Sequence, residues 1–144
     1  MNNNNSYGKK EKLKSRKLLG TVFGAGKSFL NFPVKVSFQL LEQPLDFPVK
    51  AGVGVSTRYF KRAVDRNRVK RLLRETYRLN KSPLIQYCTE NNLQLAVFFL
   101  YVDKQLPEFE ALQTIMQGAL KRLVTQLEKR QREGTEATRD KGTK

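Results

Sequence analysis

Apolar and polar side chains alternate cleanly over residues 32–41, FPVKVSFQLL. Val34, Val36, Phe38 and Leu40 share one face, and Lys35, Ser37 and Gln39 share the other. A period of two predicts a β-strand with one buried face and one polar, cationic face. A second strand is predicted at residues 49–56, VKAGVGVS, whose glycines would let another backbone approach closely. We expect these two strands to pair as an antiparallel hairpin.

Helical spacing of apolar residues, at intervals of three and four, marks most of the remaining chain. Helices are predicted at residues 9–25, 62–80 and 107–130, with a shorter one at 83–90 after the break KSP. The last long helix should bury a stripe formed by Leu112, Ile115, Met116, Ala119, Leu120, Leu123 and Leu127. Residues 93–101, LQLAVFFLY, are almost continuously apolar, which predicts a central strand.

These strands and helices fit into one α/β domain, since the chain has 144 residues and shows no internal repeat. The expected domain spans residues 9–130. Residues 1–8, MNNNNSYG, are polar and low in complexity, so we expect a disordered tail there. Residues 131–144 are expected to form a second disordered tail, which is rich in charge.

The charge of the chain narrows the range of possible partners. It has 28 lysines and arginines but only 13 acidic residues, so its net charge is +15. A chain with this charge repels itself unless it meets a polyanion, which is either nucleic acid or an anionic membrane. No apolar run reaches about 18 residues, so no transmembrane helix is expected. Of the two polyanions we expect nucleic acid as the partner, and no membrane. The single Cys88 and the polar N-terminal segment favour a reducing, cytoplasmic environment.

Missing residue types argue against a self-sufficient enzyme. The chain contains no histidine, which removes the commonest general base and the commonest metal ligand. With one cysteine and no histidine, zinc sites and Cys–His nucleophile pairs are excluded. A protein-only nuclease would need clustered carboxylates, whereas Asp46, Asp65, Glu75 and Asp103 stand singly. We therefore predict a binding protein with no catalytic residue of its own.

The predicted helix at 62–80 carries the densest charge, with six arginines and one lysine over residues 62–78, RAVDRNRVKRLLRETYR. Its apolar face is formed by Val69, Leu72, Leu73 and Thr76, and rows of cations flank that face. Arginine presents a planar fork that matches phosphate oxygens, so the pattern favours a phosphate backbone over an ordinary solvated face. Asn67 adds a neutral donor and acceptor that can reach a sugar hydroxyl, a base edge or a hydrated metal ion.

The stretch AVDRNRVKRLLRE resembles the signature of the bacterial ribonuclease P protein family, whose hallmark is an Arg-Asn-Arg triplet followed by a basic and apolar run. KLKSRKLLGTVFGAGKSF resembles the family's N-terminal helix, and GVGVS resembles its second strand. The resemblance covers roughly residues 9–130. It implies an α/β sandwich with a small mixed sheet of three to four strands, packed by helices and containing a left-handed crossover between parallel strands.

The resemblance also implies a function as protein cofactor of a catalytic RNA that removes the 5′ leader of precursor tRNA. The RNA and its Mg²⁺ ions would perform the hydrolysis, with one protein per RNA. The residues implied to contact this ribonuclease P RNA are Arg62, Arg66, Asn67, Arg68, Lys70, Arg71 and Arg74, with Asn67 also reaching RNA-bound Mg²⁺. The residues implied to line a cleft for the leader are Leu19, Phe23, Lys35, Ser37 and Arg58.

Other functional classes make different demands on the sequence. A ribosomal or other basic RNA-binding protein would share the charge, but its effect would not depend on a tRNA leader. A DNA-binding helix-turn-helix needs a helix shortly before the basic one, where this chain has a glycine-rich strand. The segment GTVFGAGKS has five residues between Gly20 and Gly26, whereas a phosphate loop has four.

Overall fold

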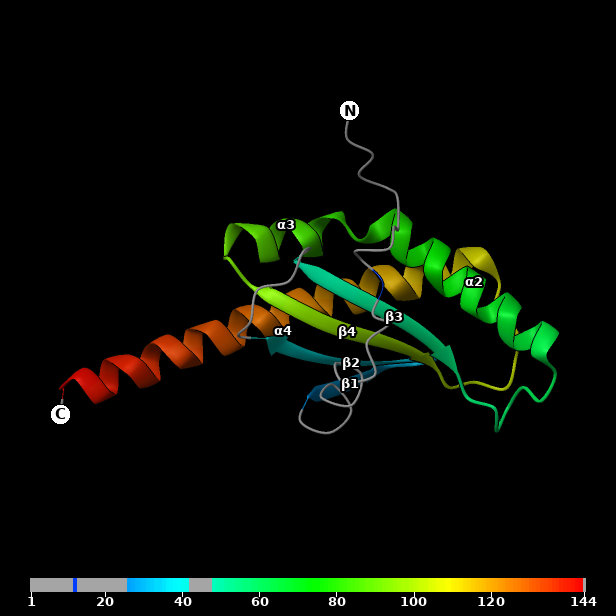
Figure 1. Cartoon of the computed structure of the whole chain (residues 1–144), viewed down its shortest axis with the longest axis horizontal. Coiled ribbons are helices and arrows are strands. Elements are labelled where there is room, and N and C mark those ends of the chain that lie inside the picture. Colours follow the sequence, from blue (N-terminus) through cyan, green and yellow to red (C-terminus); the bar gives the residue numbers. More distant parts are fainter. Residues whose placement is uncertain (1–11, 13–25, 42–47, 144) are drawn as a thin grey trace, which may run out of the picture.

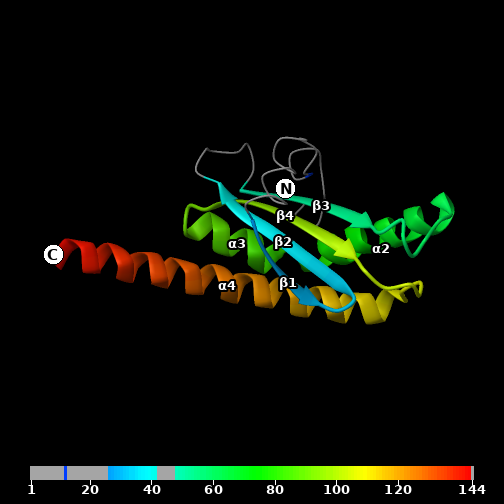
Figure 2. The ribbon, with the colours of Figure 1, turned by 90° about the horizontal axis from the view of Figure 1, so that it is seen from below.

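The computed structural model describes residue 12 and residues 26–41 and 48–143 of the chain. A four-stranded sheet forms one layer, and the three helices lie together against one of its faces (Figures 1 and 2). In chain order the elements are β1 (Lys27–Asn31), β2 (Val34–Leu41), β3 (Val49–Val55), α2 (Ala63–Asn80), α3 (Ser82–Glu90), β4 (Gln94–Tyr101) and α4 (Phe109–Thr143). The predicted α/β sandwich with a small mixed sheet is confirmed.

The order of the strands is β1-β2-β4-β3, so β4 is an inner strand, as its apolar sequence predicts. It runs antiparallel to β2, with Val36 opposite Phe99, and parallel to β3, with Val53 opposite Phe99. The predicted hairpin between residues 32–41 and 49–56 is therefore wrong, because β4 lies between the two strands. The strand that forms a hairpin with β2 is β1, which the sequence pattern did not reveal.

The connection from β3 to β4 passes through α2 and α3 on the helical side of the sheet and returns to a parallel neighbour. Figures 1 and 2 together show that this crossover is left-handed. Right-handed crossovers hold in about 98% of such units. The left-handed crossover is thus a distinctive feature of the fold, and it agrees with the expectation from the family resemblance.

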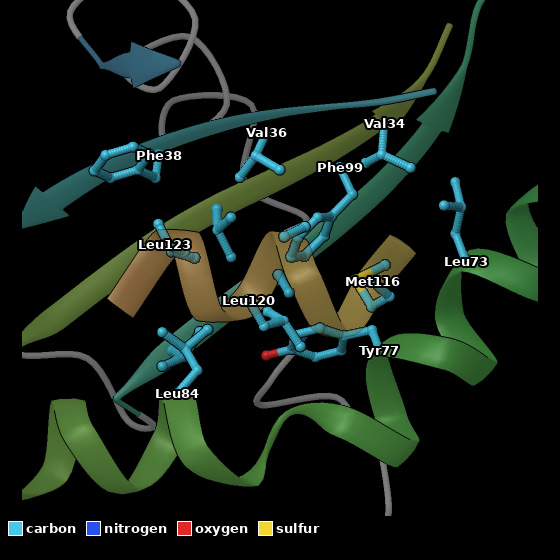
Figure 3. Close-up of a cluster of buried hydrophobic side chains, with 14 of the residues drawn as sticks. Val34, Val36, Phe38, Leu73, Tyr77, Leu84, Phe99, Met116, Leu120 and Leu123 are labelled. Carbon is cyan, nitrogen blue, oxygen red and sulfur yellow. The ribbon is translucent and has the colours of Figure 1, made fainter. Parts of the chain in front are cut away.

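The hydrophobic core fills the space between the sheet and the helices (Figure 3). One face of β2 contributes Val34, Val36 and Phe38, each at most 1% exposed. The predicted stripe of α4 is confirmed, since all its members are buried except the partly buried Ile115. The ring of Tyr77 on α2 packs against that of Phe99, with centroids 5.4 Å apart. Helix α2 is thereby held to the sheet near its C-terminal end.

Some predicted boundaries need correction. Helix α4 begins at Phe109, just after Pro107, and continues to Thr143, past the predicted end at residue 130. In the predicted helix at 9–25, Lys12 is the described residue, and it forms an isolated parallel bridge with Ala51 of β3, so the helical prediction is wrong there. The rest of that segment, with Leu19 and Phe23, and the tail at residues 1–8 lie outside the described residues. No helix in the described ranges is both long and apolar enough to cross a membrane.

Candidate nucleic-acid interface

Helix α2 has one face fixed in the core, and this fixes where its charges point. Val69, Leu73, Thr76 and Tyr77 are buried, while Leu72 is partly buried. The prediction of the apolar face is therefore confirmed in its main part, and Tyr77 is an addition to it. Because side chains three and four apart share a helix face, the remaining positions must point away from the sheet.

The solvent face of α2 presents cations that no other described group neutralises. Arg68, Arg71 and Arg74 are exposed, and none of the three forms a hydrogen bond or an ion pair with the rest of the described chain. Lys70 lies among them, half-buried, and Asn67 is exposed one turn earlier. Three guanidinium groups with all their donors free can donate hydrogen bonds to phosphate oxygens without breaking any internal contact.

Arg66 differs from these three, because its guanidinium group is engaged within the protein. Its Nη1 donates hydrogen bonds to the main-chain oxygens of Phe60, at 2.9 Å, and Lys61, at 2.7 Å. These two residues precede the helix, and the cap residue Arg62 provides no side-chain hydrogen bond to the first turn. Arg66 therefore holds the entry loop against α2. The sequence pattern gave no sign of this structural role.

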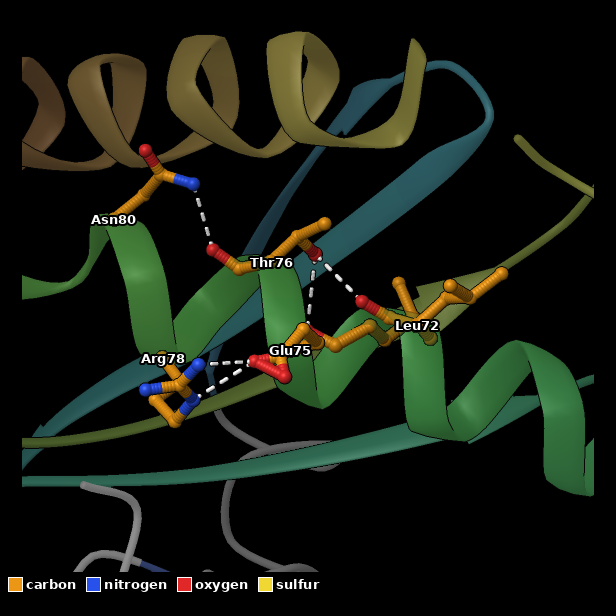
Figure 4. A network of polar contacts seen from close by, with 6 residues as sticks. Leu72, Glu75, Thr76, Arg78 and Asn80 are labelled. Carbon is orange, nitrogen blue, oxygen red and sulfur yellow. Dashed lines mark hydrogen bonds and ion pairs between the residues drawn. The ribbon is translucent and has the colours of Figure 1, made fainter. Parts of the chain in front are cut away.

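The two outermost arginines lie beside acidic residues. Arg62 Nε lies 3.9 Å from the Asp65 carboxylate, and Arg78 Nε donates to the Glu75 carboxylate at 2.8 Å. Further hydrogen bonds secure the C-terminal half of α2 (Figure 4). The Thr76 hydroxyl donates to the Leu72 carbonyl at 2.9 Å, and Asn80 Nδ2 donates to the Thr76 carbonyl at 2.7 Å. The free arginines thus project from a well-secured helix.

The second predicted surface lies on the sheet face opposite the helices. Ladder register places Lys35 and Ser37 of β2 on this face together with Phe98 of β4, which lies directly across from Ser37. Lys35 is exposed as predicted, but Ser37 is only 8% exposed, so the prediction of a uniformly wet face is wrong at this residue. Ser37 lies on an inner strand, between Ser28 of β1 and Phe98 of β4.

Phe98 lies on the sheet face opposite the core and is partly exposed. Gly54 makes room for it, because a Cβ atom at this position would lie only 2.6 Å from Phe98 Cζ. The group that approaches this glycine is therefore a side-chain ring and not the backbone that its sequence suggested. Alternation along β4 is the signal for this placement, since Leu95, Val97 and Phe99 take the core side.

Arg58 lies in the turn between β3 and α2, and so connects the two surfaces along the chain. It is exposed, and its guanidinium carbon lies 5.9 Å from the centre of the Tyr59 ring. Its main-chain N–H donates to the Ser56 hydroxyl at 3.2 Å, which shapes the turn. The other two residues predicted for the cleft, Leu19 and Phe23, lie outside the described residues.

Titratable groups within the described ranges do not form a catalytic constellation. No three acidic or cysteine side chains come together there in a way that could hold a metal ion. Burial raises the pKa of the Cys88 thiol to about 11, which keeps it protonated and unreactive at neutral pH. Burial, and next the nearby Asp103, raises the pKa of Tyr101 to about 12. Its hydroxyl donates to the Gln105 carbonyl at 2.7 Å, a structural contact.

The fold and this surface together define a class: small, basic α/β sandwiches with a left-handed crossover and an arginine-rich helix on the outside. The family model for ribonuclease P matches residues 7–124. The chain therefore belongs to the ribonuclease P protein family, whose members are the protein part of an endoribonuclease that acts on tRNA precursors.

Individual relatives agree with this assignment. The ribonuclease P protein component of Porphyromonas gingivalis is 39% identical over 115 residues, which cover 80% of this chain and 84% of the relative. That of Chlorobium phaeobacteroides is 34% identical over 118 residues, covering 75% and 81%. The Thermotoga maritima ribonuclease P protein structure superposes with a TM-score of 0.57 at 25% identity, covering 78% and 96%. The Staphylococcus aureus structure shares the fold, with a TM-score of 0.60 at 20% identity, covering 77% and 93%.

Proposed function

We propose that this chain is the protein cofactor of a ribonuclease P ribozyme and promotes removal of the 5′ leader from precursor tRNA. The observation that carries the proposal is the set of unpaired guanidinium groups of Arg68, Arg71 and Arg74 on the solvent face of α2. Membership in the family supplies the RNA partner, ribonuclease P RNA.

In this proposal the solvent face of α2 binds the catalytic RNA. Arg68, Arg71 and Arg74 bind phosphate oxygens, with Lys70 as a point charge between them. Arg62 and Arg66 extend the surface toward the start of the helix, where first-turn N–H groups without a side-chain cap add positive potential. The Asn67 amide is short and neutral, which suits a contact to water around RNA-bound Mg²⁺.

The sheet face opposite the helices holds the single-stranded leader of the precursor tRNA in this proposal. Lys35 attracts the phosphates, and the partly exposed ring of Phe98 offers a surface on which a base can stack. Leu19, Phe23, Ser37 and Arg58 complete the cleft in the proposal. Both interactions depend on features that all nucleotides share, so leaders of different sequence should be accepted.

The hydrolysis itself belongs to the RNA in this proposal. Mg²⁺ ions ligated by the RNA would activate water and stabilise the leaving oxygen. The protein contributes binding and positioning, with one copy per RNA, and operates in the cytoplasm without a membrane partner. Its surface lowers the repulsion between two polyanions that must come together, and this help should matter most when Mg²⁺ is scarce.

Cleavage of a precursor tRNA by a bacterial ribonuclease P RNA at low Mg²⁺, with and without the protein, tests the proposal. Substrates with a long leader and with a single-nucleotide leader are compared. We expect strong rescue by the protein, and a larger rescue for the long leader. RNA binding without rescue would indicate a general RNA-binding protein. Cleavage by the protein alone would overturn the assignment of the chemistry to the RNA.

A further inference from the structure

A second group of cations lies outside α2, where the start of β1 meets the side of α4. The described residues there enclose a hollow of about 290 Å³, lined by Lys27, Gln126, Lys129 and Arg130. Three of these four side chains are cationic, and the fourth carries an amide. The proposed function gives these residues no role.

The position of α4 against β1 is fixed by Arg122. Its Nη1 donates to the Leu30 carbonyl at 2.9 Å, and its guanidinium carbon lies 4.6 Å from the centre of the Phe29 ring. Gln126 and Arg130 follow Arg122 at intervals of four, so they lie along the same side of the helix. Lys27 precedes Phe29 by two and shares its face of β1, which turns it toward α4.

Over the part of α4 whose side chains the structure describes, up to residue 130, this side carries no acidic group, whereas the side toward α3 does. Glu128 lies toward α3, where its charge, after burial, helps to raise the pKa of Tyr87. Lys27, Lys129 and Arg130 form no hydrogen bond or ion pair with any described residue. Like charges gathered around one hollow repel each other, so the arrangement is unfavourable until an anion enters it.

We infer that this hollow is a second binding site for phosphate groups of an RNA backbone, separate from the surface of α2. The inference rests on the proposed function for the identity of the polyanion. A guanidinium fork, two ammonium groups and an amide match phosphate oxygens. The residues that line the hollow belong to β1 and to the middle of α4, and none of them belongs to α2. The two sites can therefore bind different parts of an RNA complex.

The test compares two double variants that remove equal charge. Lys129→Gln with Arg130→Gln empties the hollow of two cations, while Lys104→Gln with Lys121→Gln removes two exposed cations elsewhere. Binding is measured over a salt series in two arms, to ribonuclease P RNA and to precursor tRNA presented to the assembled holoenzyme. Each lost phosphate contact should weaken binding about fivefold to tenfold near 0.1 M salt and lower the log–log salt slope by about 1.

We expect the first variant to weaken binding in one arm by more than tenfold, and the control by less than about twofold. The arm that responds identifies the RNA. Lys27→Gln, from the other side of the hollow, should weaken the same arm, which separates loss of the site from damage to the end of α4. Equal effects of variant and control in both arms would overturn the inference, and the proposed function would stand if Arg68→Gln with Arg71→Gln still weakened binding. If no variant weakened binding, both would fall.

Discussion

At the scale of single residues, Arg66 combines two roles that its neighbours do not share. Its guanidinium group bonds the carbonyls of Phe60 and Lys61, so we expect Arg66→Gln to lower the free energy of unfolding by about 1–2 kcal/mol. Arg68→Gln is the matched control and should change stability by less than about 0.5 kcal/mol. Urea unfolding measures both. Equal stability of the two variants would show that the two hydrogen bonds contribute nothing.

Gly54 controls the position of the Phe98 ring. Gly54→Ala would place a Cβ atom 2.6 Å from Phe98 Cζ, so the ring must move. We expect weaker binding of long-leader substrate, unchanged binding of ribonuclease P RNA, and a loss of about 1 kcal/mol in stability. Gly118→Ala on α4 is the control, because its nearest contact would be an ordinary 3.4 Å to Asn31 Nδ2 and alanine favours the helix. If Gly54→Ala left the binding of the long-leader substrate unchanged, Phe98 would have no role in the cleft.

Cys88 links stability to pH. Burial raises the pKa of its thiol from 9.0 to about 11, so the folded protein holds this proton more tightly than the unfolded chain. The resulting stabilisation is complete below pH 9.0 and is lost as pH rises toward about 11. Unfolding in urea at about pH 8 and about pH 10 should show a drop that Cys88→Ala lacks. An equal drop in both proteins would mean that other groups cause it.

At the scale of elements, α2 presents a row of arginine hydrogen-bond donors on its solvent face. Arg68→Gln with Arg71→Gln should weaken binding to ribonuclease P RNA by more than tenfold near 0.1 M salt, because two phosphate contacts are lost. The melting temperature should stay unchanged, because neither side chain bonds to the described protein. Lys104→Gln with Lys121→Gln again provides the control. A matching loss in this control would show that only net charge matters.

The elements also show how far sequence patterns reach. Alternation located β2, and spacing of three and four located the buried stripe of α4, because each pattern reports which side chains are buried. The order of the strands could not be predicted in this way, because neither strand's pattern indicates that β4 lies between β2 and β3. β1 escaped detection because its five residues include a single buried one, Phe29. Similarly, the sequence located the free arginines of α2 but could not show that Arg66 turns back to its own backbone.

At the scale of the whole molecule, charge should dominate the affinity. The net charge is +15, with 28 lysines and arginines against 13 acidic residues. We assume that six cations each neutralise one phosphate: two from the hollow and four on α2, namely Arg68, Lys70, Arg71 and Arg74. The affinity for ribonuclease P RNA should then fall about 10³-fold between 50 and 200 mM salt. Titration at several salt concentrations measures this directly. A nearly flat salt dependence would contradict phosphate binding as the main source of affinity.

The insertion of β4 between two earlier strands has a consequence for the chain during its synthesis. The hairpin of β1 and β2 can form as soon as it emerges from the ribosome, but β3 must wait for β4, its strand partner among the described elements. Until Tyr101 has emerged, the apolar face of α2 has no closed sheet to cover. The nascent chain therefore exposes, for a time, a helix with an uncovered apolar face and many arginines, next to the ribosome's own RNA. Mispairing and aggregation should be most frequent during this interval.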